Sequence, residues 1–364
     1  MTDTDIETIR KAIGGTDLPG LDIDLAAAKA AIDVEITGGT AAIRVTLGFP
    51  AAGIVDELAR QIADRVVANT AADAADVEID WRVRAHAVQG TLEPLENVRN
   101  VIAVGSGKGG VGKSTTAVNL ALALAAEGAR VGVLDADVYG PSQPRMLGVC
   151  GERVGSADGT TMEPIEAHGV QTVSMGLLVD EEKPMIWRGP MVTQAVNQLI
   201  FQTNWQDLDY LIVDLPPGTG DTQLTLTQKV PLAGAIIITT PQDIALLDAR
   251  KGLKMFETVN VPVLGVIENM SLHVCSHCGH EEPIFGSGGG DRLAVESDVP
   301  LLGRLPLDID IRRDADGGDP TVVAKPGSAA ARAYREAARR AAALLSLRGV
   351  DHKSVFPRVV VENA

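Results

Sequence analysis

The 364-residue sequence predicts an α/β fold, a doubly wound and mostly parallel sheet preceded by a small α+β domain. Two observations predict it. From residue 98 onward, apolar runs rich in Val and Ile alternate with segments of helical periodicity, which is the pattern of buried parallel strands joined by helices. Before residue 89, apolar residues alternate with period two around a Gly38-Gly39 turn, which predicts an antiparallel hairpin.

The small domain is expected over residues 1–88. Strand-like alternation flanks the turn at residues 34–36 and 43–47, helical spacing follows at 54–66, and alternation returns at 77–83. A polar stretch containing Gly90 and Pro94 comes next and is typical of a linker. The predicted divisions are therefore the small domain at 1–88, a linker at 89–97, the large domain at 98–348 and a tail at 349–364.

The large domain is expected to carry its ligands along one edge of the sheet. Its predicted strands each end in a cluster of Gly, Asp, Pro or Asn, and they lie at 101–106, 130–137, 210–217, 235–241 and 261–269. Ligands of such sheets bind beyond the carboxyl ends of the strands. The amphipathic Ala- and Arg-rich segment 329–347 is expected to pack on the sheet rather than to lie on a membrane.

The charge and the cysteine content restrict the class of protein. Forty-eight acidic and thirty-two basic residues give a net charge of −16, which argues against general binding of nucleic acids or membrane surfaces. The amino terminus lacks the features of a signal peptide, and no run of about 18 apolar residues follows, so we expect a cytoplasmic protein. Three cysteines make no disulfide framework, and Cys150 is expected to be a buried thiol.

A phosphate-binding loop is the strongest motif. Residues 107–114 read GKGGVGKS and match GxxxxGK[ST], between an apolar strand and a helical pattern. Backbone N–H groups of such a loop wrap the phosphates of ATP, while Lys113 neutralises the β- and γ-oxygens and Ser114 binds Mg²⁺. The predicted loop contacts to ATP are Gly107, Lys108, Gly109, Gly110, Val111, Gly112, Lys113, Ser114 and Thr115.

Lys108, inside this loop, makes the motif resemble the deviant Walker A class, which includes partitioning and nitrogenase-reductase-like ATPases. In that class the additional lysine reaches the nucleotide held by a partner. The resemblance therefore implies a catalytic role for Lys108, alongside Lys113, and a homodimer that encloses ATP between its subunits.

Two strand ends carry carboxylates, in Asp135-Ala136-Asp137 and at Asp214. Burying charge at a strand end is costly unless the charge has a use. By resemblance, Asp137 positions or activates the attacking water, and Asp214 holds Mg²⁺ through water. The loop at 218–220 is suited to sense the γ-phosphate, and Asn269 is a candidate for binding the adenine edge.

Cys275 and Cys278 lie in the run HVCSHCGH, a spacing at which two thiolates share one metal. The pair supplies only two ligands. The others must come from a second chain or from nearby histidines, which are His273, His277 and His280. From the chemistry alone, zinc and a 4Fe-4S cluster both stay open.

Taken together, the motifs resemble the Mrp/ApbC-type ATPases that carry iron-sulfur clusters. GKGGVGKS, DADVYGPS, WRGPM, DLPPGTGD and CxxC occur in matching order over residues 90–345. The resemblance implies an ATP-hydrolysing homodimer that holds a 4Fe-4S cluster at Cys275 and Cys278 and transfers it to apoproteins. Residues 1–88 resemble the small domain of cluster-assembly proteins but lack its cysteine, so we expect no cluster chemistry there.

Alternatives from other functional classes share the nucleotide motifs. A partitioning or positioning ATPase has no use for the CxxC pair and needs a DNA-binding surface or a membrane-targeting tail. In a zinc-stabilised regulatory ATPase the cysteines are structural, and metal analysis distinguishes it from the carrier. A reductase that delivers electrons through its cluster is the third alternative.

Overall fold

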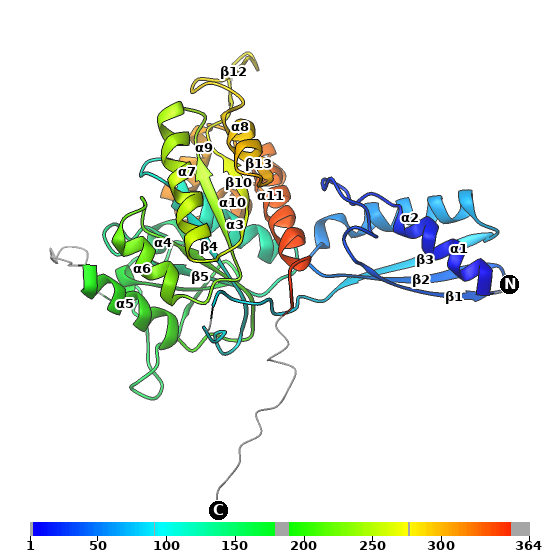
Figure 1. Ribbon diagram of the computed structural model, residues 1–364, viewed down its shortest axis with the longest axis horizontal. Helices are drawn as coiled ribbons and strands as arrows, with labels where there is room; N and C mark the ends of the chain where they lie inside the picture. Colours follow the sequence, from blue (N-terminus) through cyan, green and yellow to red (C-terminus); the bar gives the residue numbers. More distant parts are fainter. Residues whose placement is uncertain (1–2, 91, 179–188, 276, 351–364) are drawn as a thin grey trace, which may run out of the picture.

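The computed structural model of the protein describes residues 3–90, 92–178, 189–275 and 277–350 (Figure 1). Parts of several sequence predictions therefore lie outside the described residues. These include residue 91 of the predicted linker, Trp187 and Arg188 of the WRGPM motif, Ser276 of the HVCSHCGH run, and residues 351–364 of the predicted tail.

The amino-terminal domain forms one helical layer on one sheet. Its elements, in order, are α1 (Asp3–Gly14), β1 (Ala31–Thr37), β2 (Thr40–Leu47), η1 (Ala52–Ile54), α2 (Val55–Asn69) and β3 (Ala74–Trp81). The expected hairpin is present, because β1 and β2 pair antiparallel across the glycine turn, while β3 pairs parallel to β2. The helices pack on one face of this sheet, which buries alternate residues of β2, and the opposite face stays exposed.

The large domain is built on a mostly parallel sheet. Within the described residues its strand order is β13-β10-β9-β4-β8-β5-β7-β6, and only β6 runs antiparallel to its neighbour. The bounds are β4 (Val98–Gly105), β5 (Val131–Asp135), β6 (Ile165–Ala167), β7 (Val170–Ser174), β8 (Leu208–Asp214), β9 (Gly234–Thr239), β10 (Val263–Glu268) and β13 (Leu301–Arg304). The expected strands are all present. Strands β6, β7 and β13 are additional to those predicted, because they have no more than five residues each and give little periodic signal.

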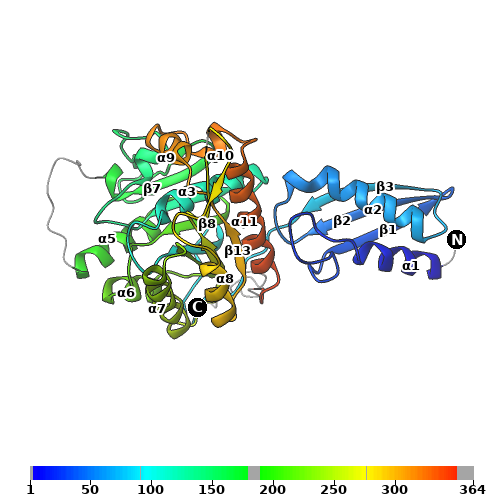
Figure 2. The same ribbon diagram turned by 90° about the horizontal axis from the view of Figure 1, so that it is seen from above.

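Helices cover both faces of this sheet (Figure 2). One face carries α3 (Lys113–Ala126), α4 (Gln143–Met146), α9 (Ile309–Asp316), α10 (Thr321–Ala324) and α11 (Ala329–Ser346). The other carries α5 (Gly189–Phe201), α6 (Asp221–Lys229), α7 (Asp243–Thr258) and α8 (Gly289–Glu296). Successive residues of β4 enter opposite cores, with Ile102 on the α3 side and Ala103 on the α7 side, so the doubly wound prediction is confirmed.

The carboxyl-terminal helix α11 packs on the protein, as expected from its amphipathic pattern. It contacts α3, β10 and β13, and Tyr334 on it is fully buried. Among the described residues, no helix has both the length and the apolar character needed to cross a membrane.

A buried charge network joins the two domains. Glu127, which directly follows α3, is fully buried and accepts hydrogen bonds from Arg335 and Arg339 of α11, at 2.8 and 2.7 Å. The same carboxylate accepts the backbone N–H of Gly53, in η1, at 2.8 Å. The amino-terminal domain is thus attached directly to the end of the helix that begins at the phosphate-binding loop.

One cysteine prediction is wrong. Cys150 is exposed, not buried. Its neighbour Val149 takes the buried position in the turn that follows α4, and Cys150 lies at the surface.

Candidate nucleotide and metal site

The phosphate-binding loop connects β4 to α3 at the carboxyl edge of the sheet. Gly112 immediately precedes α3 and has φ of +79°, a left-handed conformation that L-residues with side chains avoid. A side chain here would also collide with the amide of Asn269. The loop therefore requires glycine at this position to turn the backbone N–H groups toward a phosphate at the helix amino terminus.

Lys113 lies at the centre of the site and is only 6% exposed. Its ammonium group forms an ion pair with Asp214. The same group lies 3.2 Å from Ser114 Oγ and 3.9 Å from Asp137 Oδ2. The structure thus brings together four of the predicted residues, from the loop and from the ends of two strands. Because a phosphate attracts the same ammonium group, nucleotide binding would draw Lys113 away from Asp214.

Two carboxylates are adjacent in register on neighbouring strands. Asp135 of β5 pairs with Asp214 of β8, and both are fully buried. Burial, followed by the charge of Asp214, raises the pKa of Asp135 to about 7. Burial also raises the pKa of Asp137, although the nearby Lys113 opposes this shift. The site therefore holds more acidic groups than its single lysine neutralises.

This donor set fits Mg²⁺, a hard cation that prefers oxygen ligands. The Ser114 hydroxyl and the Asp214 carboxylate both contact Lys113 Nζ. These two oxygen groups thus already surround a positive charge, that of the lysine ammonium group. Gln143 Oε1, a further oxygen acceptor, is buried and has no hydrogen-bond partner among the described residues. An unpartnered buried acceptor beside Asp214 is suited to a metal-bound water.

Asp135 and Gln143 also belong to the site, although the sequence motifs predict no specific role for either. Asp135 accepts hydrogen bonds from the backbone N–H groups of Asp137, Ser142 and Gln143 at 3.0 to 3.1 Å, and so fixes the loop after β5. Gln143 Nε2 donates to Asp214 Oδ2 at 2.9 Å and to the Ser114 carbonyl at 3.1 Å. Both lie in the run DADVYGPSQ, but Gln143 contacts Asp214, which is 71 residues away, and Asp135 is in register with the same residue.

The remaining loop predictions differ in how the structure places them. Asn269 Nδ2 donates to the Val111 carbonyl at 2.8 Å, and its Oδ1 accepts from Met270 N at 2.9 Å, so this amide supports the loop. Its contact with adenine stays a prediction. Lys108 is half-buried, and its ammonium group forms no ion pair with any described residue. Its role toward a partner's nucleotide also stays a prediction.

The predicted γ-phosphate sensor lies against the loop. Gly218 N donates to the Ser106 carbonyl at 3.0 Å, and Gln223 of α6 donates to the Pro217 carbonyl. The segment that joins β8 to α6 therefore touches the loop at one end and is held by α6 at the other. A shift caused by a bound γ-phosphate would be transmitted to α6.

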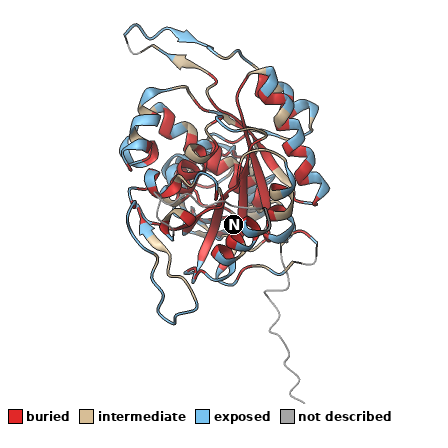
Figure 3. Ribbon diagram, turned by 90° about the vertical axis from the view of Figure 1, so that its left-hand side faces the viewer, coloured by how far each residue is buried: buried red, intermediate tan, exposed pale blue. Residues whose placement is uncertain are grey.

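The two paired cysteines lie on a projecting hairpin, formed by β11 (His273–Val274) and β12 (Glu281–Glu282) (Figure 3). Cys275 N donates to the His280 carbonyl, and Gly279 N to the Cys275 carbonyl, each at 2.9 Å, so the turn is ordered by its own backbone. His273 is committed elsewhere, because its Nδ1 lies 3.0 Å from the Leu307 carbonyl. No group of three or more His, Cys, Asp or Glu among the described residues is arranged to hold a metal.

The turn also prepares Cys275 as a ligand. Backbone N–H groups of Cys278 and His277 point at its sulfur and lower the pKa of the Cys275 thiol.

In a Cys150→Ser/Cys278→Ser variant, we expect alkylation of Cys275 by iodoacetamide to reach half its maximal rate at a lower pH than alkylation of a free cysteine peptide does. The rate measured against pH by mass spectrometry checks this, and identical profiles would contradict it.

Comparisons with known proteins agree with this geometry. The family model described as NUBPL iron-transfer P-loop NTPase matches residues 97–342, and that of an iron-sulfur cluster assembly protein matches residues 6–81. The iron-sulfur cluster carrier protein of Escherichia coli K12 is 50% identical, with 94% of each chain covered. The iron-sulfur cluster transfer protein NUBPL of Mus musculus is 53% identical over 66% of this chain and 76% of its own.

A solved nucleotide-binding protein from Archaeoglobus fulgidus, in complex with ADP, is 35% identical and has a TM-score of 0.55 over 61% of this chain and 87% of that one. The chain therefore belongs to the family of NUBPL-type iron-transfer P-loop NTPases.

Proposed function

We propose that this protein is an ATP-hydrolysing carrier that holds a 4Fe-4S cluster between two copies of the chain and transfers it to apoproteins. The observation that carries the proposal is the pair of half-buried Cys275 and exposed Cys278 on its own hairpin, in a chain of the iron-transfer P-loop family. The names of the relatives support the cluster as the cargo.

The ligand number supports a shared cluster. Each chain offers two thiolates at this hairpin, and a 4Fe-4S cluster takes four. Two chains related by a twofold axis would bring their hairpins together and complete the set. Because each chain contributes only two of the four thiolates, separation of the subunits would expose the cluster, which suits a carrier better than a permanent cofactor.

The residues around Lys113 support ATP hydrolysis. Ser114 and Asp214 would hold Mg²⁺, which when bound neutralises the charge that develops on the phosphate oxygens. Lys113 would leave Asp214 for the β- and γ-phosphates, and Asp137, 3.9 Å from Lys113, would orient the attacking water. Lys108 of the partner would complete the charge balance. We infer slow hydrolysis, coupled to loading or transfer of the cluster.

Reconstitution of the cluster tests this function. After anaerobic incubation with iron and sulfide, we expect the protein to be a brown dimer with about four irons per two chains. The Cys275→Ala/Cys278→Ala variant should bind no cluster, whereas Cys150→Ala, the matched control, should bind as much as the wild type. Visible absorption, iron analysis and sedimentation provide the measurements.

Two results would contradict the proposal. Tight binding of zinc in place of iron would favour the regulatory ATPase with structural cysteines. Iron binding that is unaffected by the double substitution would place the cluster elsewhere. If the cluster forms as expected, its transfer to an apoprotein, followed by recovery of that protein's cluster absorption, completes the test.

A further inference from the structure

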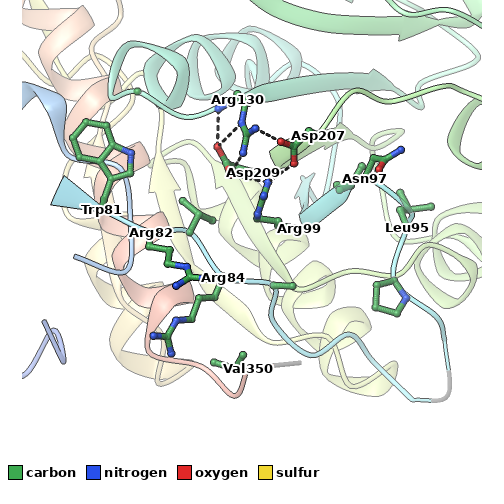
Figure 4. Close-up of a pocket in the computed structure, with 15 residues that line it drawn as sticks. Trp81, Arg82, Arg84, Leu95, Asn97, Arg99, Arg130, Asp207, Asp209 and Val350 are labelled. Atoms are coloured by element: carbon green, nitrogen blue, oxygen red, sulfur yellow. Dashed lines mark hydrogen bonds and ion pairs between the residues drawn. The ribbon is translucent and has the colours of Figure 1, made fainter. Parts of the chain in front are cut away.

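A second site lies at the opposite edge of the large sheet from the nucleotide loop. There the chain leaving β3, the linker and the amino ends of β4, β5 and β8 surround a cavity of about 880 Å³ (Figure 4). A smaller cavity of about 390 Å³ adjoins it and shares Arg82, Arg84 and Val350 as lining residues. Residues 82–85, which follow β3, thus run between two open hollows.

These cavities are positively charged in a protein of net charge −16. The cations that line them are Lys29, Arg82, Arg84, Arg99, Arg130 and Arg348, and the carboxylates are Asp207 and Asp209. Both carboxylates are already paired with Arg99 and Arg130 on one wall. The local excess of positive charge therefore comes from the other residues, chiefly the two arginines that both cavities share.

Arg82 and Arg84 are exposed and form no ion pair or side-chain hydrogen bond with any described residue. Figure 4 shows their side chains leaving the same segment with no contact drawn, opposite the paired Arg99 and Arg130. Because their positions differ by two, they lie on one side of a chain that continues the direction of a strand. Two unpaired guanidinium groups at this spacing match carboxylates at alternate positions of an extended peptide.

The N–H groups of the same segment are also largely unpaired, although the Arg84 carbonyl accepts a hydrogen bond from Asn100 Nδ2 at 2.9 Å. Arg82 N donates to the Leu47 carbonyl at 2.9 Å, and His86 N donates to Asn100 Oδ1 at 3.1 Å. Between these two anchors, the N–H groups of residues 83–85 donate to no described residue. Unpaired N–H groups next to a sheet are a template for an added strand.

We propose that residues 82–85 bind an acidic, extended segment of a partner protein by strand addition. The partner's main chain pairs with residues 83–85, and its alternate carboxylates contact Arg82 and Arg84. Its apolar side chains lie against Trp81 and Leu95, which both line the larger cavity. A small anion would pair with the guanidinium groups but would leave the row of backbone N–H groups without acceptors. A peptide supplies partners for both. The proposal requires neither ATP nor a cluster.

The probe is a fluorescein-labelled peptide of sequence Glu-Val-Glu-Val-Glu-Val, measured by fluorescence anisotropy with the full chain in the absence of nucleotide and iron. We expect saturable binding that weakens at least tenfold in Arg82→Glu/Arg84→Glu. The matched control is Arg10→Glu/Arg60→Glu, which changes the net charge equally at exposed helical arginines outside both cavities. This control should keep the affinity of the wild type within twofold, and thermal unfolding of all variants confirms that they fold.

A second probe tests the backbone contacts. The same peptide N-methylated at alternate residues keeps its charges but loses main-chain donors, and we expect it to bind at least tenfold more weakly. Equal binding of the methylated peptide, or competition by tripolyphosphate at equal charge concentration, would overturn strand addition in favour of a simple anion site. Equal effects of the two double substitutions would overturn the location. Binding that appears only after removal of residues 351–364 would make the chain's own carboxyl-terminal segment the occupant and overturn the partner proposal.

Discussion

Replacement of Lys113 by alanine is expected to lower ATP turnover by about 10² to 10³-fold. The ammonium group is the only lysine charge that the described structure places within 4 Å of Asp137 and Asp214, the carboxylates predicted to act on water and Mg²⁺. Without it, the β- and γ-phosphates lose their nearest cation, and the buried Asp214 loses its ion-pair partner. Phosphate release measured at saturating ATP and Mg²⁺ gives the rate.

The matched control for this change is Lys254→Ala. Lys254 forms an exposed ion pair with Glu257 on α7, so its loss should leave turnover within twofold of the wild type. Binding of a fluorescent ATP analogue separates loss of affinity from loss of chemistry, and we expect at least a tenfold weaker affinity for Lys113→Ala. Turnover within twofold of the wild type would contradict the assignment of residues 107–114 as the catalytic nucleotide loop.

Glu127→Ala is expected to lower the free energy of unfolding by about 3 to 5 kcal/mol. The substitution leaves Arg335 and Arg339 partly or fully buried without their carboxylate, and it removes the acceptor for Gly53 N. Removal of one partner from a buried ion pair is costly because the remaining charge stays desolvated. Because Gly53 belongs to the amino-terminal domain, the loss also weakens the attachment of that domain.

Urea unfolding followed by circular dichroism gives the stability, and limited proteolysis within residues 89–97 reports on the attachment of the domain. Glu78→Ala is the control, because Glu78 forms an ion pair with Arg44 that is about two-thirds exposed on both sides. Its loss should cost no more than about 1 kcal/mol. Equal effects of the two substitutions would show that the Glu127 network does not hold the domains together in solution.

A large part of the site follows from local sequence patterns. The phosphate-binding loop is contiguous, and its residues share one strand, one turn and one helix start, so their spacing alone fixes their geometry. The same holds for the Cys275 and Cys278 turn, whose backbone hydrogen bonds span no more than six residues. The buried strands β4, β5, β8, β9 and β10 contain continuous apolar runs, and this pattern distinguishes them from the alternating strands of the small domain.

Other parts of the site depend on residues far apart in the chain. The sequence placed Asp135 and Asp214 at strand ends, but only the strand order makes β5 and β8 neighbours and sets the two carboxylates in register. Gln143 gains its role from a contact with Asp214, 71 residues away, which no periodicity indicates. Short strands such as β13 are strands chiefly because β10 lies beside them.

The amino-acid sequence by itself therefore determined the alternation of the longer strands with helices, the nucleotide loop and the paired cysteines, because each depends on neighbours within a few residues. The tertiary structure decided the partners of Lys113, the buried Glu127 network between the domains, and the arginine-lined cavities around residues 82–85. These features arise where segments separated by tens to hundreds of residues meet. Whether a charged side chain in these features finds a partner depends on which distant segments pack beside it, and no local sequence pattern encodes that packing.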